Sequence, residues 1–389
     1  MATTDAPLKS VRYCELDSLR GLAALTVVIH HFRILWWSEA QPSSRILRAI
    51  SWRVTPLGNE AVLLFFVLSG FVLSLPAVTG KPQRYSTFLI RRVFRIYAPY
   101  LVALAASIAG AFWLHGIVTR SEWFHGAWSE LVDWQVVWQH LLFLGNYDYG
   151  QFDNPIWSLV HEMRISLVFP FLCAAVLHLR REWALFFALG LSTAAVLLEV
   201  KPFLIDAQLA NSLHYAAFFI LGILLARYRF ALGAWFSGFR KPTQIWILVA
   251  VLWLFLFAGP QAASKLLVHF SHGWLWWPIP DWISAFGASC LIIVSMSFEG
   301  LKRFLHWRPV HFLGEISYSL YLWHFIVMLY CVHLLYGRIP LGAILCLIFV
   351  LSLVVSWCSY RWIEVPCIAV GRRLGNMRRL RPVGAEPYM

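Results

Sequence analysis

The first long apolar segment of the chain carries two ionisable residues at a spacing suited to one helical face. Arg20 and His31 are eleven residues apart, so in an α-helix they are offset by about 20° and separated by about 16 Å. His30 is turned away from that face by about 80°. We therefore expect Arg20 at a membrane surface and His31 directly above it, where ionisable groups are costly and often functional. A buried histidine that bonds to a neighbouring helix is the alternative.

A pair of arginines precedes the third apolar segment. Arg92 and Arg95 are three residues apart, so they lie on one face of a helix. Guanidinium groups bind phosphates in a bidentate manner that lysines cannot match. The pair is therefore a candidate phosphate site, with ordinary positive charge at the cytoplasmic end of a membrane helix as the alternative.

An acidic residue lies inside the fourth apolar segment. Glu162 follows Trp157 by five residues, which places it about 8 Å further along the helix axis. Glu162 is therefore expected to be an intramembrane charge, and such charges are commonly functional. A structural ion pair with Arg164 is the competing interpretation.

A polar stripe marks the ninth apolar segment. Ser317, Tyr321 and His324 fall within about 60° of one another on a helix. The stripe ends in a second buried imidazole, which makes His324 a candidate site residue. A hydrogen-bond network between packed helices explains the stripe about as well.

The composition indicates that these segments cross a membrane. The 389 residues are 60% hydrophobic and only 13% charged, whereas soluble domains carry roughly twice that charged fraction. Many of the 21 tryptophans lie at the ends of apolar runs, as in the interfacial belts of membrane proteins. The net charge of +13 is spread over short loops, so a nucleic-acid partner is not expected. The seven cysteines include no CxxC pair, and neither a disulfide framework nor a metal site is predicted.

The predicted fold is all-α: a polytopic transmembrane helix bundle of about ten spanning helices, because each span needs roughly 17 to 25 apolar residues. We expect one integral-membrane domain over 1–389, with a short N-terminal segment (about 1–15), a basic C-terminal tail (about 366–389) and no internal repeat. The longest connection, about 119–156, is expected to lie on the membrane surface. The expected spans are 17–37, 58–78, 96–118, 157–178, 183–199, 207–227, 243–259, 280–298, 312–336 and 340–362.

Lys and Arg residues concentrate in the N-terminal segment, in every second loop and in the C-terminal tail. Cytoplasmic loops of membrane proteins carry this excess of positive charge. The sequence therefore predicts a multi-pass protein of the cell membrane with both termini in the cytoplasm.

Taken together, these segments resemble the family-three membrane acyltransferases, which O-acylate polysaccharides and related acceptors. The family's arginine–ten residues–histidine motif falls on Arg20 and His31, and its paired-arginine motif falls on Arg92 and Arg95. The fourth segment departs from the usual pattern, since His161-Glu162-Met163-Arg164 stands where Glu-Glu-Gln-Phe-Tyr is more common. The similar stretches occur in the family's order: 16–31, 65–71, 92–99, 157–162, 314–324 and 360–366.

The resemblance implies an acyl-CoA donor, most simply acetyl-CoA, whose phosphates are held by Arg20, Arg92 and Arg95. Its pantetheine arm would extend along the first helix and bring the thioester to His31. His31 would then act as general base on an acceptor hydroxyl or as the nucleophile that carries the acyl group. The acceptor would be a carbohydrate or another hydroxyl-bearing molecule.

The same resemblance implies supporting roles for three further residues. Glu162 would orient His31 or an acceptor sugar from the outer side. His324 and Tyr321 would donate hydrogen bonds to the developing oxyanion.

Two other classes of protein are compatible with buried charges in a helix bundle. A transporter or flippase of a glycan or anionic small molecule could line its pathway with them, although the internal repeats and broken helices of many transporters are not evident. A structural or sensory membrane protein would not require Arg20 and His31 on one face. Consumption of acetyl-CoA distinguishes an acyltransferase from both.

Overall fold

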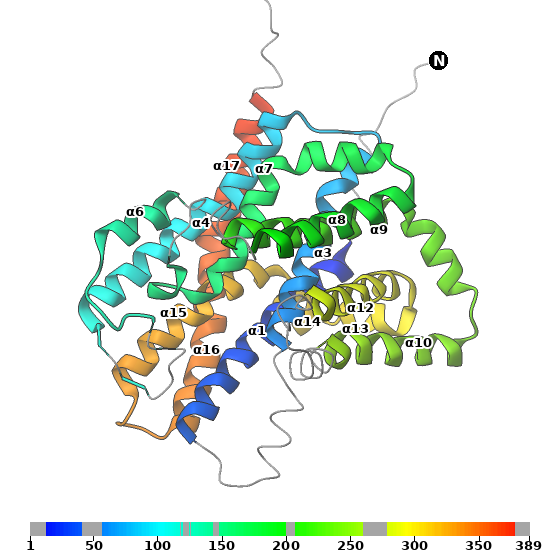
Figure 1. The fold of residues 1–389 in the computed structure, drawn as a ribbon. Coiled ribbons are helices and arrows are strands. Elements are labelled where there is room, and N and C mark those ends of the chain that lie inside the picture. The colour runs from blue at the N-terminus through cyan, green and yellow to red at the C-terminus, as the bar shows by residue number, and fades with distance from the viewer. Residues whose placement is uncertain are drawn as a thin grey trace, which may run out of the picture.

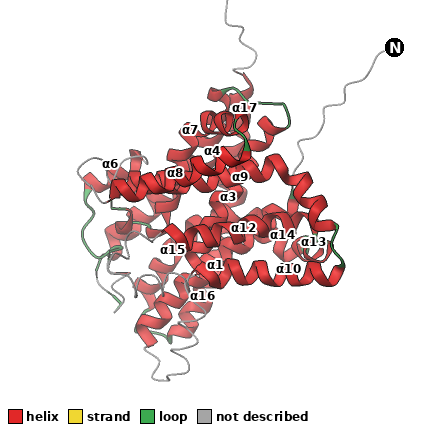
Figure 2. Cartoon of the chain, turned by 45° about the vertical axis from the view of Figure 1, so that its right-hand side comes forward, coloured by secondary structure: helices red, strands yellow, loops and turns green. Residues whose placement is uncertain are grey.

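The computed structural model describes residues 13–40, 57–142 apart from 117, 120–123 and 125, 148–199, 207–259 and 278–377. These residues form helices and connecting turns, and no strand occurs among them (Figures 1 and 2). The helices are α1 (Cys14–Ala40), α3 (Leu57–Val78), α4 (Tyr85–Leu114), α6 (Trp134–Leu142), η1 (Tyr149–Gln151), η2 (Asn154–Ile156), α7 (Trp157–His178), α8 (Arg181–Glu199), α9 (Ala207–Ser237), α10 (Lys241–Trp253), η3 (Leu254–Ala258), α12 (Pro278–Ser297), α13 (Glu299–Leu305), α14 (Arg308–Glu315), α15 (Ser317–Leu335), α16 (Leu341–Ser359), η5 (Tyr360–Glu364) and α17 (Val365–Met377).

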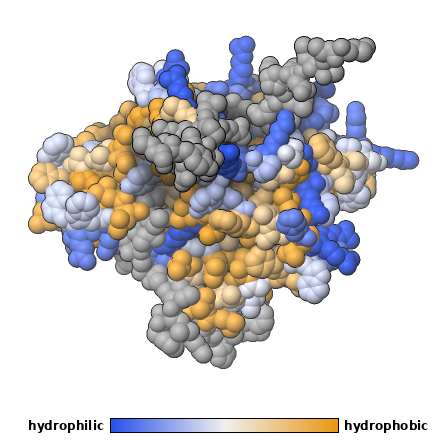
Figure 3. All heavy atoms as spheres, turned by 90° about the horizontal axis from the view of Figure 1, so that it is seen from above, coloured by the Kyte–Doolittle hydropathy of each residue, from blue (hydrophilic) through white to orange (hydrophobic). Residues whose placement is uncertain are grey.

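Ten candidate spans are long and apolar enough to cross a membrane among the described residues. Each overlaps one of the ten predicted spans, so the prediction of an all-α transmembrane bundle is confirmed. Large apolar side chains such as Trp113, Trp246 and Phe230 are more than 70% exposed, as is expected where the surrounding solvent is lipid. Figure 3 shows that apolar side chains cover much of the described surface on one face of the molecule.

Helix α1 lies at the centre of the first group of helices. It packs against α3, α14, α15 and α12. The contact with α14 is a close approach of two backbones, since a Cβ atom on Gly21 would lie 2.3 Å from the Gly314 nitrogen. The two glycines therefore fix the position of Arg20, which directly precedes this crossing, relative to α14.

Helix α9 organises the second group. It packs against α3, α7, α8 and α12, and α8 runs alongside it in Figure 1. Phe218, Phe219 and Ile220 of α9 are fully buried and belong to one apolar core that continues into α1, α4, α7 and α15. Because α3 contacts both α1 and α9, it joins the two groups.

The first part of the predicted basic C-terminal tail, about 366–389, is helical. Helix α16 continues through the π-helical turn η5 into α17, which ends at Met377 and packs along α4 (Figure 1). Gly371 and Gly375 are buried in this contact, beside Phe94 and Thr87. The same contact accompanies the extension of α4, which begins at Tyr85 instead of the predicted residue 96. The chain after residue 377 lies outside the described residues.

The connection between α4 and α7, which the sequence predicts to lie on the membrane surface, packs against the helix bundle in its described part. Trp128 is fully buried, and its indole nitrogen donates a hydrogen bond to Ser107 Oγ in α4 (3.0 Å). Its ring fills the space beside Gly110, where a Cβ atom would clash with it, and stacks edge-on against Tyr330 of α15. The described part of the connection therefore packs onto α4 and α15, because Gly110 leaves room for a large side chain.

Candidate active site

Helix α1 presents Arg20 and His31 as the spacing predicts, with His31 only 7% exposed. Arg20 is largely buried and lies 3.8 Å from Asp17. His30 faces elsewhere, since its ring packs against Gly58 at the start of α3. The two adjacent histidines therefore have different surroundings, and only His31 is on the Arg20 face.

His31 meets the second predicted histidine, His324 of α15. Nδ1 of His31 lies 2.8 Å from Nε2 of His324, and the two rings are nearly parallel, at 10°. The residues are far apart in the sequence, and the packing of α1 against α15 brings them together. Two candidate catalytic residues thus form one hydrogen-bonded pair.

The hydrogen bonds of His324 determine which nitrogen carries each proton. Nδ1 of His324 lies 2.7 Å from the Tyr321 carbonyl and 3.0 Å from the Leu320 carbonyl. Carbonyl oxygens only accept, so this nitrogen carries a hydrogen. In neutral His324, Nε2 then accepts from Nδ1–H of His31, and the lone pair of neutral His31 resides on Nε2. The backbone of α15, His324 and His31 form a relay that orients a base.

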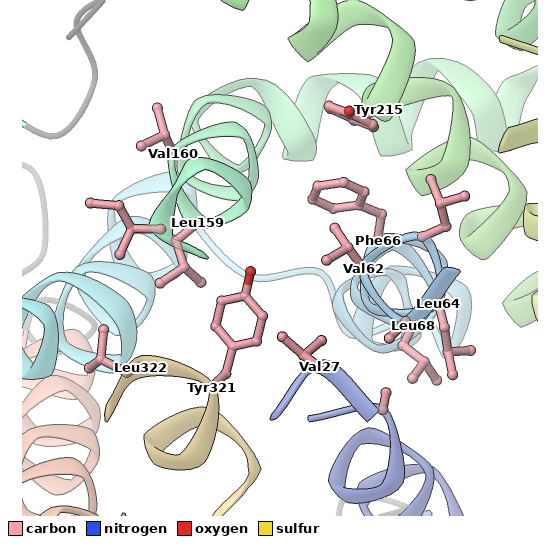
Figure 4. Close-up of a cluster of buried hydrophobic side chains, with 14 of the residues drawn as sticks. Val27, Val62, Leu64, Phe66, Leu68, Leu159, Val160, Tyr215, Tyr321 and Leu322 are labelled. Atoms are coloured by element: carbon pink, nitrogen blue, oxygen red, sulfur yellow. The ribbon is translucent and has the colours of Figure 1, made fainter. Parts of the chain in front are cut away.

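Tyr321 does not have the role that the resemblance implies. Its hydroxyl donates to the Pro155 carbonyl (2.7 Å) and accepts from Ser158 Oγ (2.6 Å). The single hydroxyl proton is thereby committed to a backbone oxygen, so Tyr321 is not placed to donate to an oxyanion. Figure 4 shows the ring between Leu159 of α7 and Val27 of α1. The hydrogen bonds of Tyr321 to Pro155 and Ser158 connect α15, which carries His324, to the start of α7.

Glu162 is paired with an arginine, but not with Arg164. Its Oε1 accepts from Nη2 of Arg92 at 2.7 Å and from Ser69 Oγ at 3.0 Å. Arg164 instead donates to the Gln208 carbonyl at 3.0 Å. Glu162 therefore pairs with Arg92 and not with Arg164, which is the alternative suggested by the sequence. Helix α7 directs Glu162 toward α4 and Arg164 toward α9.

Arg92 and Arg95 differ in exposure although they are one helical turn apart. Arg92 is 7% exposed and also donates to Ser166 Oγ (2.9 Å), whereas Arg95 is exposed. Arg20 interacts electrostatically with Arg95, Glu162 and Arg92. The three predicted arginines thus gather around Glu162, at the end of α1 that lies about 16 Å from His31.

Glu364 belongs to the same group and is not singled out by the sequence. It is buried in η5, accepts a hydrogen bond from Ser319 Oγ (2.9 Å), and interacts electrostatically with Arg95. π-helical turns often occur at functional sites. The sequence signal for Glu364 is that it is an acidic residue at the end of the last apolar segment. No group of three or more His, Cys, Asp and Glu that could hold a metal ion occurs among the described residues.

Ten candidate membrane-crossing helices and a buried, hydrogen-bonded pair of histidines are features of a multi-pass membrane protein with a candidate active site. The model of the Acyl_transf_3 family, described as an acyltransferase domain, matches residues 15–361. The chain therefore belongs to this family of membrane acyltransferases, as the sequence motifs indicate, and it is an acyltransferase.

Several curated proteins are similar to the chain over most of its length. Acyltransferase MdmB of Streptomyces mycarofaciens is 27% identical over 98% of this chain and 96% of its own length. The putative membrane-bound transacylase BcsY of Komagataeibacter xylinus is 26% identical over 90% of this chain and 81% of its own. The putative peptidoglycan O-acetyltransferase YrhL of Bacillus subtilis is 22% identical over 93% of this chain and 56% of its own. No solved structure matches the chain.

Proposed function

We propose that the chain is a membrane-bound O-acyltransferase that moves an acyl group, most simply acetyl, from cytoplasmic acyl-CoA to a glycan hydroxyl. The acceptor is extracytoplasmic or membrane-associated. The 2.8 Å contact between His31 and His324 carries the proposal, because it orients a base in the interior of the protein. The names of O-acetyltransferase relatives such as YrhL support the reaction class and the glycan acceptor.

The donor's phosphates bind at the arginine group. Arg95 is exposed and Arg20 lies close enough to interact with it, so the two guanidinium groups offer charge-assisted hydrogen bonds to a phosphate. Arg92 holds Glu162 and adds a third positive charge beside them. The 16 Å rise along α1 then separates the phosphate site from His31 by about the length of a pantetheine arm.

His31 removes the proton from the attacking hydroxyl. Nε2 of His31 accepts the hydroxyl proton while the oxygen attacks the thioester carbon. The carbon–sulfur bond then breaks, and the imidazolium returns the proton to the departing thiolate, so no proton is gained or lost. His324 stabilises the imidazolium by accepting from its Nδ1–H, as the orienting residue of a catalytic triad does.

A covalent route uses the same atoms. In that route Nε2 of His31 attacks the thioester, the thiolate leaves, and the acyl group remains on His31 until the hydroxyl oxygen displaces it, while the hydroxyl proton converts the released thiolate to the thiol. Both routes require the lone pair on Nε2 that His324 fixes. Glu162 serves either route indirectly, by holding Arg92 in the donor site.

Both termini lie in the cytoplasm in this proposal, which puts the arginine group on the side where acyl-CoA is made. Reporter fusions that end at Gly80 and at Gly337 provide a matched test. Each glycine lies in an open turn with positive φ, and a Cβ atom at either would meet nothing within 4 Å. The Gly80 fusion should report the cytoplasm and the Gly337 fusion the outside. The reverse result would place the arginines on the wrong side for the donor.

Acetyl transfer itself is tested with the purified full chain in nanodiscs and acetyl-CoA labelled in the acetyl group. Thiol release together with label in an ester that hydroxylamine cleaves is the expected result. A transporter or flippase would leave acetyl-CoA intact, and that outcome would contradict the proposal.

A further inference from the structure

A second polar network lies outside the histidine relay, where α3, α8, α9 and α12 meet. Asp281 accepts from Asn59 Nδ2 at 2.8 Å through one oxygen, and its other oxygen lies 3.3 Å from Nε2 of His214. Nδ1 of His214 lies 2.7 Å from Ser192 Oγ, which also accepts from the indole of Trp282. Four side chains, one each from α3, α8, α9 and α12, therefore fix the Asp281 carboxylate in a single orientation.

Two polar groups beside this network have no hydrogen-bond partner among the described residues. Glu60 is 4% exposed and its Oε2 is buried without a partner. The Tyr215 side chain is 8% exposed, and its hydroxyl makes no hydrogen bond with the described chain. Both groups interact electrostatically with Asp281. An unpaired buried polar atom is costly, so Oε2 of Glu60 points to a ligand that supplies its partner, and the Tyr215 hydroxyl can bond to the same ligand.

The surroundings of Tyr215 are aromatic. Its ring centroid lies 4.7 Å from that of Phe66, 5.7 Å from Trp157 and 4.9 Å from His161. Figure 4 shows Tyr215 above Phe66. Flat aromatic faces beside carboxylate and amide groups suit a sugar ring, which presents C–H bonds on its faces and hydroxyls at its edge.

The network lies at the same end of the helices as the histidine relay. Asn59 and Glu60 directly follow Gly58, which touches the His30 ring, and the His30 and His31 rings are 5.3 Å apart. At the other side, Trp157 follows Pro155, whose carbonyl accepts from Tyr321, the residue three before His324. An acceptor bound between Glu60 and Tyr215 would therefore have its reacting hydroxyl directed toward the relay.

The charges at this place select among acceptors. Asp281 is acidic, and Arg164, which interacts electrostatically with His161 beside Tyr215, donates to Gln208 and Ser212. An anionic acceptor would be repelled, whereas neutral hydroxyls donate hydrogen bonds to carboxylate oxygens.

We propose that Glu60, Asp281 and Tyr215 form the acceptor subsite and that it takes a neutral, polyhydroxylated ring. This inference rests on the proposed O-acyltransferase function and specifies the acceptor class at that site. Glu60 and Tyr215 bind acceptor hydroxyls other than the hydroxyl that reacts. Asn59 and His214 hold the Asp281 carboxylate in position.

The test uses two glycosides of similar size, methyl β-D-glucopyranoside and methyl β-D-glucuronide. They differ by the one negative charge of the uronate carboxylate. The full chain in nanodiscs free of sugar detergents is given acetyl-CoA and either glycoside, and the acetyl ester is measured by mass spectrometry. We expect kcat/KM for the neutral glycoside to be at least tenfold higher. Asp281→Asn should narrow that preference, and Tyr215→Phe should raise the KM for the neutral glycoside several-fold with the KM for acetyl-CoA unchanged.

Glu299→Gln is the matched control, because this glutamate is exposed in α13 and paired with Lys302. It should leave the charge preference as it is. A preference for the anionic glycoside, an unchanged preference in Asp281→Asn, or hydrolysis of acetyl-CoA with neither glycoside acetylated would each overturn the subsite. Intact acetyl-CoA would refute the acyltransferase proposal instead, and saturation-transfer NMR of the neutral glycoside with wild type and Tyr215→Phe would then decide the subsite by itself.

Discussion

His324 accepts a hydrogen bond from Nδ1 of His31 at 2.8 Å while its own Nδ1 is held by two backbone carbonyls. This arrangement gives His31 one defined tautomer. In the proposed mechanism His324 is a positioning residue, because its ring would act on the reaction through His31.

Replacing His324 tests that role. His324→Ala should lower kcat for acetyl transfer by roughly 10²-fold or more, since a misoriented base loses most of the 10²–10⁴ that general-base catalysis supplies. His324→Gln should retain more activity, because the amide oxygen can still accept from Nδ1–H of His31. The KM for acetyl-CoA should stay the same in both variants, as measured by initial rates. Equal activity in the two variants would show that the acceptor atom of His324 is irrelevant.

The two arginines of α4 should respond differently to truncation. Arg95→Ala should weaken acetyl-CoA binding roughly tenfold in calorimetry, because a charge-assisted hydrogen bond is worth about 1.5–3 kcal/mol. Arg92→Ala should instead lower stability by about 3–5 kcal/mol, because it leaves Glu162 buried without its partner. Its folded yield should fall accordingly. If Arg95→Ala binds acetyl-CoA as tightly as wild type, Arg95 is only an ordinary positive charge at the cytoplasmic end of a membrane helix.

The crossing of α1 and α14 should not tolerate a side chain. Gly21→Ala places a Cβ atom 2.3 Å from the Gly314 backbone, so the helices must separate beside Arg20. We expect a lower thermal midpoint and a higher KM for acetyl-CoA. Gly190→Ala in α8 is the control, because a Cβ atom there meets nothing within 4 Å, and it should be neutral or slightly stabilising. Similar midpoints for both variants would mean that the close approach is not rigid.

Asp153, in the turn before η2, should make stability depend on pH. Burial raises the pKa of this carboxyl well above its usual value, so the folded protein holds the proton more tightly than the unfolded chain. Below about pH 4 both states are protonated and Asp153 has no effect. As the pH rises from there toward the raised pKa, wild type loses stability relative to Asp153→Asn. Thermal midpoints at pH 5 and pH 8 should show a gap that widens with pH, and a constant gap would contradict this assignment.

The sequence was sufficient for the elements but not for all contacts between them. Ten apolar runs predict ten helices because a bilayer imposes length and hydrophobicity on each one. The phase of α1 follows from helix geometry, so the separation of His31 from His30 was predictable. The connection between α4 and α7 was not, because the burial of Trp128 depends on a gap at Gly110 that only the packed structure reveals.

Side-chain partners were the least predictable part of the site. His31 and His324 were both candidates, yet nothing in the spacing shows that they touch. Glu162 has an adjacent arginine in the sequence but pairs with Arg92, because helix phase directs Glu162 and Arg164 to different neighbours. Glu364 is marked in the sequence only as an acidic residue at the end of the last apolar segment, and the Asp281 network is not visible in a linear pattern, because its members come from separate helices.

The central claim, that His31 is the base or acyl carrier, is tested most directly by comparing His31→Ala with His30→Ala. The two residues are adjacent and chemically identical, but only His31 bonds to His324, whereas His30 packs on Gly58. Acetyl ester formation from labelled acetyl-CoA is measured for both variants at equal folded amounts. We predict that His31→Ala loses at least about 10²-fold in rate and still binds acetyl-CoA, while His30→Ala remains within a few-fold of wild type. Loss of transfer in His30→Ala with activity retained in His31→Ala would contradict the account.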